Sequence, residues 1–353
     1  MSEQSHVDSQ ARHGSPAAPE AVPRRGVLAA WSYALRTINP PPGHIDPVTR
    51  WLVATRAAVL PMTLTAGLVA ALLAVGHPGL NVGYLALAVV GICLAHMANN
   101  LMNDLFDTGA GSDTDAYPRA LYAPHPILSG LVTRRAMIGA ALLVNVADLV
   151  ILVVLTAARG WPVVAFALGG FVLSVAYTAP PLRLKKRGLG EPDVLVVWGP
   201  LMVAGTYYSA VGNIPWQVWL ASIPYGLLCT AVLMGKHIDK ARYDRELGIN
   251  TLPVLLGDGR ARALTRGLTF AFYPTVVVCV LVGAMPWPAL VAFGAVGALV
   301  RAWRALGAPT PEQPPPGFPV WPLWFAAIEF VHTRLAGALL VAGLTVAAVF
   351  GIG

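Results

Sequence analysis

The sequence predicts an all-α, polytopic membrane protein: a bundle of nine transmembrane helices with a central cavity that faces the lipid. The main support is composition, because 56% of the 353 residues are hydrophobic, only 12% are charged, and the mean hydropathy is +0.64. A soluble domain carries about 25% charged residues, and a disordered chain needs low hydrophobicity. The net charge of +7 does not indicate a nucleic-acid partner, because the charges lie in short gaps between long apolar runs.

The chain divides into a polar N-terminal stretch, residues 1–45, and an apolar domain, residues 46–353. We expect the first to be a disordered cytoplasmic tail that ends in an amphipathic stretch, residues 31–38, on the membrane surface. A helix needs about 20 apolar residues to cross the hydrocarbon core. The stretches that reach or approach this length are, in order, 51–75, 81–102, 135–157, 161–178, 192–211, 216–236, 263–284, 286–303 and 334–352.

The basic residues test this division. Of the 24 Lys and Arg residues, 23 lie in the tail, in the first stretch or in the segments that follow even-numbered stretches. Only Arg159, between the third and fourth stretches, falls on the other side. Because Lys and Arg accumulate on the cytoplasmic side, we expect a multi-pass cell-membrane protein with its N-terminus in the cytoplasm and its C-terminus outside.

The end of the second stretch is rich in Asn and Asp and reads N-N-L-M-N-D-L-F-D over residues 99–107. Within it, Asn100, Asn103 or Asp104, and Asp107 recur at spacings of three and four, so they share one helix face. Carboxylates this close to a bilayer are costly when uncompensated. Mg²⁺ relieves this cost, because it takes oxygen ligands from one or two carboxylates plus substrate phosphates. The pattern therefore predicts a magnesium–diphosphate site.

The end of the sixth stretch carries a second acidic group, with Asp239 and Asp244. Five residues separate them, which places them roughly 140° apart on an ideal helix. A bulge or helix end at Tyr243 would bring them together. Otherwise Asp244 acts chiefly with Glu246, and Asp239 pairs with Lys236 or Lys240. The sequence leaves both arrangements open.

These residues and their neighbours resemble the UbiA superfamily of intramembrane prenyltransferases over about residues 45–353. The first motif, N-D-L-F-D followed by G-S-D-T-D, is most similar to that of 1,4-dihydroxy-2-naphthoate polyprenyltransferases of menaquinone synthesis. The stretch Y-T-A-P-P-L-R-L-K-K-R-G-L-G-E at 177–191 and the stretch G-I-N-T-L-P-V-L-L-G at 248–257 also resemble the family. So does Arg56, which is followed by L-P-M-T-L. The second motif departs from the family pattern, because Lys236 and His237 stand where Asn is common.

The resemblance implies an enzyme with Mg²⁺ as cofactor, a polyprenyl diphosphate as donor, an aromatic acceptor and the lipid bilayer as its surroundings. The catalytic residues that it implies are Asp107, Asp244, Lys185 and Tyr177. The implied substrate-binding residues are Asn100, Asn103, Arg56, Lys186, Arg183 and Lys236. The implied metal ligands are Asn103, Asp104, Asp107, Asp113, Asp239 and Asp244.

Two alternatives keep the membrane bundle but change its function. A cyclase of the same superfamily would act on a polyprenyl diphosphate without an acceptor, and the irregular second motif is compatible with this. A transporter with acidic ion sites predicts inverted repeats and charges near the midplane. The sequence shows no repeat and places its acidic groups at one face, which disfavours a transporter.

Overall fold

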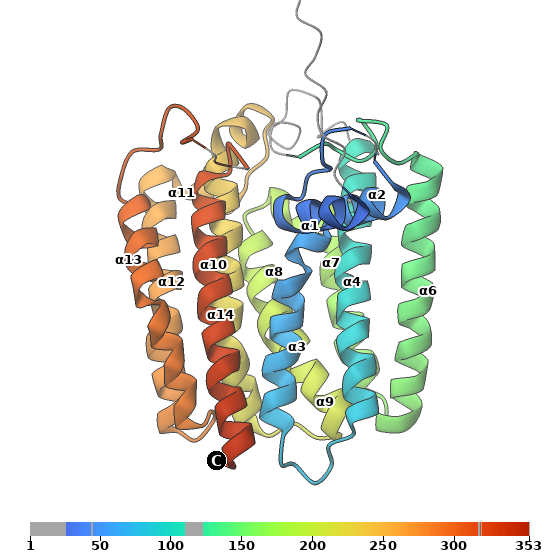
Figure 1. Cartoon of the computed structure of the whole chain (residues 1–353), viewed down its shortest axis with the longest axis vertical. Coiled ribbons are helices and arrows are strands. Elements are labelled where there is room, and N and C mark those ends of the chain that lie inside the picture. The colour runs from blue at the N-terminus through green and yellow to red at the C-terminus, as the bar shows by residue number, and fades with distance from the viewer. Residues whose placement is uncertain (1–25, 44, 110–122, 317, 319, 353) are drawn as a thin grey trace, which may run out of the picture.

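The computed structural model describes residues 26–43, 45–109, 123–316, 318 and 320–352, with only the backbone at 107–109. In this part of the chain the regular elements are all helical, and the long ones run side by side as a bundle (Figure 1). The bundle elements are α3 (Leu60–Ala74), α4 (Val82–Gly109), α6 (Arg134–Arg159), α7 (Pro162–Thr178), α8 (Gly190–Val196), η3 (Val197–Ala204), α9 (Gly205–Val211), α10 (Trp216–Glu246), α12 (Asp258–Leu281), η4 (Trp287–Ala295), α13 (Val296–Ala305) and α14 (Trp324–Phe350). The short elements are α1 (Val27–Thr37), α2 (Pro47–Ala54), η1 (Ala57–Val59), η2 (Leu184–Lys186) and α11 (Leu252–Leu256).

The expected fold class is confirmed. Among the described residues, seven helical stretches are long and apolar enough to cross a membrane, and α7 is a shorter apolar helix of 17 residues. The stretch predicted at 286–303 is helical but divided, as η4 followed by α13. The count of nine transmembrane helices therefore stays a prediction.

Three of the predicted spans begin five or more residues from the expected start, among them the seventh, which starts at Asp258 rather than 263. The first membrane stretch starts at Ala57 rather than 51, because the chain breaks at Arg56, whose φ of 53° lies in the left-handed region. The last starts at Trp324 rather than 334. Residues 324–333 were not predicted as part of the span because they contain the polar residues Glu329 and His332. Both are fully buried and bonded to α12, Glu329 to Thr269 and His332 to Tyr273.

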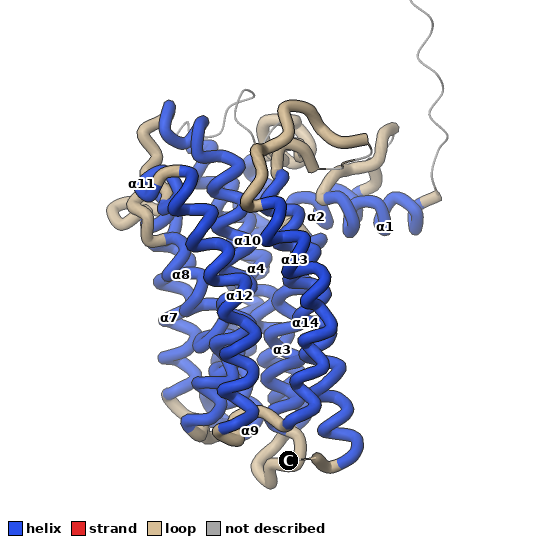
Figure 2. The backbone as a smooth tube through the Cα atoms, turned by 90° about the vertical axis from the view of Figure 1, so that its left-hand side faces the viewer, coloured by secondary structure: helices blue, strands red, loops and turns tan. Residues whose placement is uncertain are grey.

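The helices α1 and α2 lie across one end of the bundle, which we call the α1/α2 end (Figures 1 and 2). Asp46 accepts hydrogen bonds from Thr49 and from the indole of Trp31, so it joins the start of α2 to α1. These bonds, from Thr49 first and then from Trp31, lower the pKa of Asp46 to about 2. Residues 27–37 form α1 rather than a disordered tail, and α1 contains residues 31–37 of the amphipathic stretch expected at 31–38. Residues 1–25 lie outside the described part of the chain.

Small residues let the helices approach one another closely. Ala66, Ala221, Ala292 and Ala336 are fully buried in the main apolar core, and such residues are typical of helix contacts in membranes. Gly235 shows the effect most clearly, because a Cβ atom there would lie 2.8 Å from the backbone of α14. The start of α14 is therefore fixed against α10, one helical turn before Asp239.

Candidate active site at the α1/α2 end of the bundle

The end of α4 carries a row of polar side chains that are bonded to neighbouring elements. Asn99 Oδ1 accepts a hydrogen bond of 2.9 Å from Ser174 Oγ of α7. Asn100, which is buried, donates from Nδ2 to the carbonyl oxygen of Thr55 at 3.0 Å. This bond holds the backbone just after α2. The two side chains therefore fix α4 against α7 and against the segment that leads into α3.

The next two polar side chains of α4 continue the row. Asn103 Oδ1 accepts a hydrogen bond from Thr178 Oγ1 at the end of α7. Asp104 is buried and forms an ion pair with Arg56, with 2.5 Å between Oδ1 and the guanidinium nitrogen. A left-handed conformation at a residue other than Gly costs about 1–3 kcal/mol and tends to occur at functional sites. At Arg56 it directs the guanidinium to Asp104. We call Asn99, Asn100, Asn103 and Asp104 the α4 row.

The α4 row suits a hard cation in its chemistry. The side-chain atoms of Asn103, Asp104 and Asp107 that can bind a metal ion are all oxygens, and Mg²⁺ prefers oxygen ligands. Asp107 lies one turn beyond Asn103 on α4. Its side chain, and the whole of Asp113, lie outside the described residues. The metal assignments of these four residues therefore remain predictions.

The segment after α7 brings two predicted site residues together. Tyr177 is buried at the end of α7, and Lys185 lies half-buried in η2. Both approach Gly190, where a Cβ atom would lie 3.1 Å from the Tyr177 ring and 3.3 Å from the Lys185 backbone. Glycine therefore permits this contact. Lys186 is also half-buried in η2, whereas Arg183 is exposed.

A buried pair that the sequence analysis missed lies at the same point. His237 Nδ1 and Glu191 Oε1 are 2.7 Å apart, and both side chains are almost fully buried. The His237 ring lies 3.8 Å from the position of a Cβ atom on Gly190, so it neighbours Tyr177 and Lys185. A usable signal was present, since His237, Lys240 and Asp244 recur at spacings of three and four, which places them on one face of a helix.

These three residues, which we call the α10 row, form the second half of the site. Helix α10 is regular through Glu246, so the bulge considered at Tyr243 is absent. Lys240 Nζ lies 4.0 Å from Asp244 Oδ1, and both side chains are buried. The partner that Asp244 finds on its own helix face is thus a lysine.

Asp239 faces away from the α10 row. Its Oδ1 accepts a hydrogen bond of 3.0 Å from the backbone N–H of Phe325, and its Oδ2 accepts one of 2.9 Å from that of Ala326. Asp239 therefore caps the start of α14, where the first N–H groups of a helix have no intrahelical acceptor. The structure does not bring Asp239 and Asp244 together. Lys236, also predicted as a site residue, is half-buried on α10.

The two segments that carried the resemblance after the fourth and sixth stretches lie side by side. Arg187 and Asn250 form an isolated parallel β-bridge, and Arg187 also donates to the carbonyl oxygen of Pro181 at 2.9 Å. The loop that contains Lys185 is therefore fastened to the segment that follows Asp244. These links keep the basic loop beside the α10 row.

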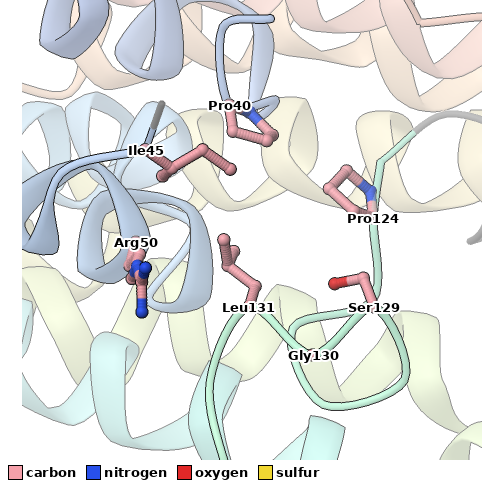
Figure 3. A pocket seen from close by; sticks show the side chains of 7 residues that line it. All are labelled: Pro40, Ile45, Arg50, Pro124, Ser129, Gly130 and Leu131. Atoms are coloured by element: carbon pink, nitrogen blue, oxygen red, sulfur yellow. The ribbon is translucent and has the colours of Figure 1, made fainter. Parts of the chain in front are cut away.

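A separate hollow of about 230 Å³ lies nearby, between the region around the start of α2 and the segment before α6 (Figure 3). Its lining includes Arg50, Ile45 and Leu131 but none of the predicted site residues. Among the described residues, no three His, Cys, Asp or Glu side chains lie close enough together to hold a metal ion. The candidate site is therefore still assigned to the α4 and α10 rows, and not to this hollow.

The opposite end of the bundle contains Arg159. Its guanidinium donates to the carbonyl oxygens of Ser209 at 3.1 Å, Gly79 at 3.0 Å and Ala210 at 2.5 Å. It thus joins the end of α6 to the end of α9 and to the loop before α4. These bonds indicate that Arg159 stabilises this end of the bundle. The α4 row lies at the other end of α4.

The bundle has the fold of a solved UbiA homologue. A structure of a UbiA homologue from Archaeoglobus fulgidus bound to GPP and Mg²⁺ matches with a TM-score of 0.55 at 14% identity, over 84% of this chain and 99% of that one. The class of protein is therefore a multi-pass membrane protein with this helical architecture.

The family model described as "UbiA prenyltransferase family" matches residues 59–328, and the chain belongs to that family. It is 32% identical to 1,4-dihydroxy-2-naphthoate octaprenyltransferase of Escherichia coli (strain K12), over 62% of this chain and 72% of the relative. It is 25% identical to 2-carboxy-1,4-naphthoquinone phytyltransferase of Synechocystis sp., over 74% of this chain and 84% of the relative. The protein is a prenyltransferase, as the sequence motifs implied.

Proposed function

We propose that this prenyltransferase moves an isoprenyl group from a polyprenyl diphosphate to an aromatic, quinone-precursor-like acceptor, within the membrane and with Mg²⁺ as cofactor. The observation that carries the proposal is the convergence at the α1/α2 end. The Tyr177 ring and the backbone of Lys185 both lie close to Gly190, and Asn103 is bonded to Thr178, the residue after Tyr177. A polar end rich in oxygen and basic groups, on an apolar bundle, suits a substrate with a diphosphate head and a hydrocarbon tail.

The acceptor class is inferred from the relatives. Two of the similar enzymes are named as a dihydroxynaphthoate octaprenyltransferase and a carboxynaphthoquinone phytyltransferase. Each name gives a bicyclic aromatic or quinone compound as the acceptor. The resemblance of the N-D-L-F-D motif to the naphthoate enzymes supports the same class. We therefore expect the acceptor to be an aromatic ring made electron-rich by hydroxyl groups.

Basic side chains neutralise the departing diphosphate in this proposal. Preorganised charges of this kind lower the barrier most where charge develops in the transition state. Arg56 is held by Asp104, so it meets the diphosphate in a fixed orientation. The further residues that would bind the diphosphate or its neighbourhood are Asn100, Asn103, Arg183, Lys185, Lys186 and Lys236.

The residues that would hold Mg²⁺ are Asn103, Asp107 and Asp113, where the ion would supply positive charge to the diphosphate oxygens. Asp104, which the resemblance also implied as a ligand, holds Arg56 instead. In the reaction the allylic C–O bond breaks and the diphosphate keeps its electron pair. A ring carbon of the acceptor then forms the new C–C bond and loses its proton. Tyr177 offers a π face to the allylic cation, and the apolar bundle keeps water away from it.

The proposal is tested by incubating the purified protein with geranyl, farnesyl and longer prenyl diphosphates, with and without 1,4-dihydroxy-2-naphthoate, and by reading the products by mass spectrometry. We expect a prenylated aromatic product that needs both substrates and Mg²⁺, and no turnover in EDTA. A cyclic hydrocarbon from the donor alone would establish the cyclase instead. Full turnover in EDTA would refute the metal requirement.

We further propose that the α1/α2 end faces the cytoplasm and that the C-terminus lies outside. The distribution of Lys and Arg supports this orientation. In the predicted topology, 23 of the 24 Lys and Arg residues belong to the cytoplasmic side, and Arg159 alone, between the third and fourth stretches, belongs to the outer side. A single reactive cysteine in the loop at 179–191 should resist an impermeant reagent in intact cells and react after permeabilisation. Labelling in intact cells would reverse the orientation.

A further inference from the structure

We propose that the α10 row contacts the diphosphate through the ammonium group of Lys240, and not through a second metal ion. The inference rests on the proposed function and concerns how the two rows divide the binding of the donor. In it, the metal is held on the α4 side, as in the proposed function. The α10 row instead supplies a cation that is part of the chain.

The first argument concerns Asp239, the other carboxylate near the end of α10. Each of its oxygens already accepts a backbone hydrogen bond from α14, at 3.0 Å and 2.9 Å. Gly235 fixes the start of α14 against α10, since a Cβ atom there would clash with that backbone. Asp239 could ligate a metal on the α10 row only by leaving these two N–H groups and turning around the helix. The residue is therefore a poor metal ligand.

The second argument concerns the charge beside Asp244. Lys240 Nζ lies 4.0 Å from Asp244 Oδ1, with side-chain exposures of 7% and 1%. A divalent cation on Asp244 would lie beside this buried ammonium, and two positive charges that are shielded from water repel strongly. The Lys240 ammonium already supplies the positive charge beside Asp244 that a metal ion would otherwise supply.

The third argument is the absence of further ligands. On the neighbouring α8, Glu191 is bonded to His237 at 2.7 Å. Among the described residues no three acidic, His or Cys side chains come together around one point. Mg²⁺ is usually bound by one or two carboxylates as well as the substrate phosphates, and the single carboxylate that the α10 row offers already lies beside the Lys240 ammonium.

The same geometry gives Lys240 a role. An ammonium group carries three N–H donors, so it can bind a phosphate oxygen while it keeps its contact with Asp244. Asp244 holds the lysine in place and is thereby a positioning residue. Lys240 is then the α10 counterpart of Arg56, which Asp104 holds in the same manner on the α4 side.

The experiment counts metal ions directly. Mn²⁺ replaces Mg²⁺, and electron paramagnetic resonance measures the Mn²⁺ bound per chain in detergent at saturating geranyl thiolodiphosphate, an unreactive donor analogue. We expect one ion in the wild type and in Asp239→Asn, the matched control. We expect two in Lys240→Asp, which replaces the ammonium by a ligand. Two ions in the wild type would overturn the inference.

A second measurement needs no metal count. The affinity for geranyl thiolodiphosphate should be about 10-fold or more weaker in Lys240→Gln, because a charge-assisted hydrogen bond to phosphate is lost. An unchanged affinity in Lys240→Gln would overturn the inference. This measurement remains valid even if Lys240→Asp fails to fold. If the wild type binds no Mn²⁺ with the analogue, the metal requirement of the proposed function fails, and the Lys240→Gln affinity still decides the role of Lys240.

Discussion

Both rows of the site contain an Asp bonded to a basic residue, but the rows are held differently. The α4 row contacts two neighbouring segments through its side chains: α7, through Ser174 and Thr178, and the segment before α3, through Thr55 and Arg56. In the α10 row His237 is bonded to Glu191 of α8, and Lys240 and Asp244 form an ion pair along their own helix. The other carboxylate near it, Asp239, supports α14 instead. Two acidic clusters that look alike in sequence therefore have different roles, the first as an organising centre and the second as a support for one lysine.

The largest effect should come from removing the link between α4 and the segment before α3. Arg56→Ala takes the guanidinium away from buried Asp104, and breaking a buried ion pair by removal of one partner costs about 3–5 kcal/mol. Thermal unfolding in detergent measures this loss. The matched control is Arg50→Ala, an exposed arginine on α2, which should change stability by less than about 0.5 kcal/mol. Equal stabilities of the two variants would mean that the α4 row does not organise its neighbours.

The second prediction tests which carboxylate serves the reaction. Asp107→Ala should lower the rate by about 10²–10³, because it removes charge from the predicted metal site of the α4 row. The assay compares purified, folded variants at saturating Mg²⁺. Asp258→Ala is the control, since Asp258 forms an exposed ion pair with Arg262 on α12, and its rate should stay near that of the wild type. A wild-type rate in Asp107→Ala would remove Asp107 from the site.

The sequence predicted the membrane bundle, because composition reports on the bilayer directly. It also named Tyr177, Lys185 and Arg56, which come together with their neighbours at the α1/α2 end. It could not separate Asp239 from Asp244 by role. That separation depends on Gly235, which lets α14 approach α10 so closely that Asp239 can cap it. Such a contact joins residues 86 positions apart and leaves no local pattern.

Glu191 and His237 were missed for a related reason. Glu191 appeared only as the last residue of the loop at 177–191, and His237 only as a departure from the family pattern. Their 2.7 Å contact spans 46 residues and is buried between α8 and α10. Periodicity places His237 on the face of Lys240 and Asp244, but only the packed structure shows what that face meets.

The third prediction concerns the side-chain bond between His237 of the α10 row and Glu191 of α8. Glu191→Ala leaves the buried Nδ1 of His237 without its acceptor, which costs about 1–3 kcal/mol of stability. The control is Glu246→Ala, where an exposed pair with Arg242 is lost and about 0–1 kcal/mol is expected. Thermal unfolding of both variants in the same detergent makes the comparison. If Glu191→Ala is the milder of the two, the pair does not hold α8 against α10.

The smallest effect should be that of Asp239→Ala, and it separates the two faces of α10. The substitution removes a carboxylate that accepts from Phe325 and Ala326. Loss of a helix cap costs about 0.5–2 kcal/mol, so the thermal transition should fall modestly. Asp239→Asn should recover part of this, because an amide keeps one acceptor oxygen. The rate at saturating Mg²⁺ should change little in either variant, since Asp239 faces α14 and not the α10 row. A folded Asp239→Ala protein without activity, beside a fully active Asp244→Ala, would show that the catalytic face of α10 is the one that carries Asp239.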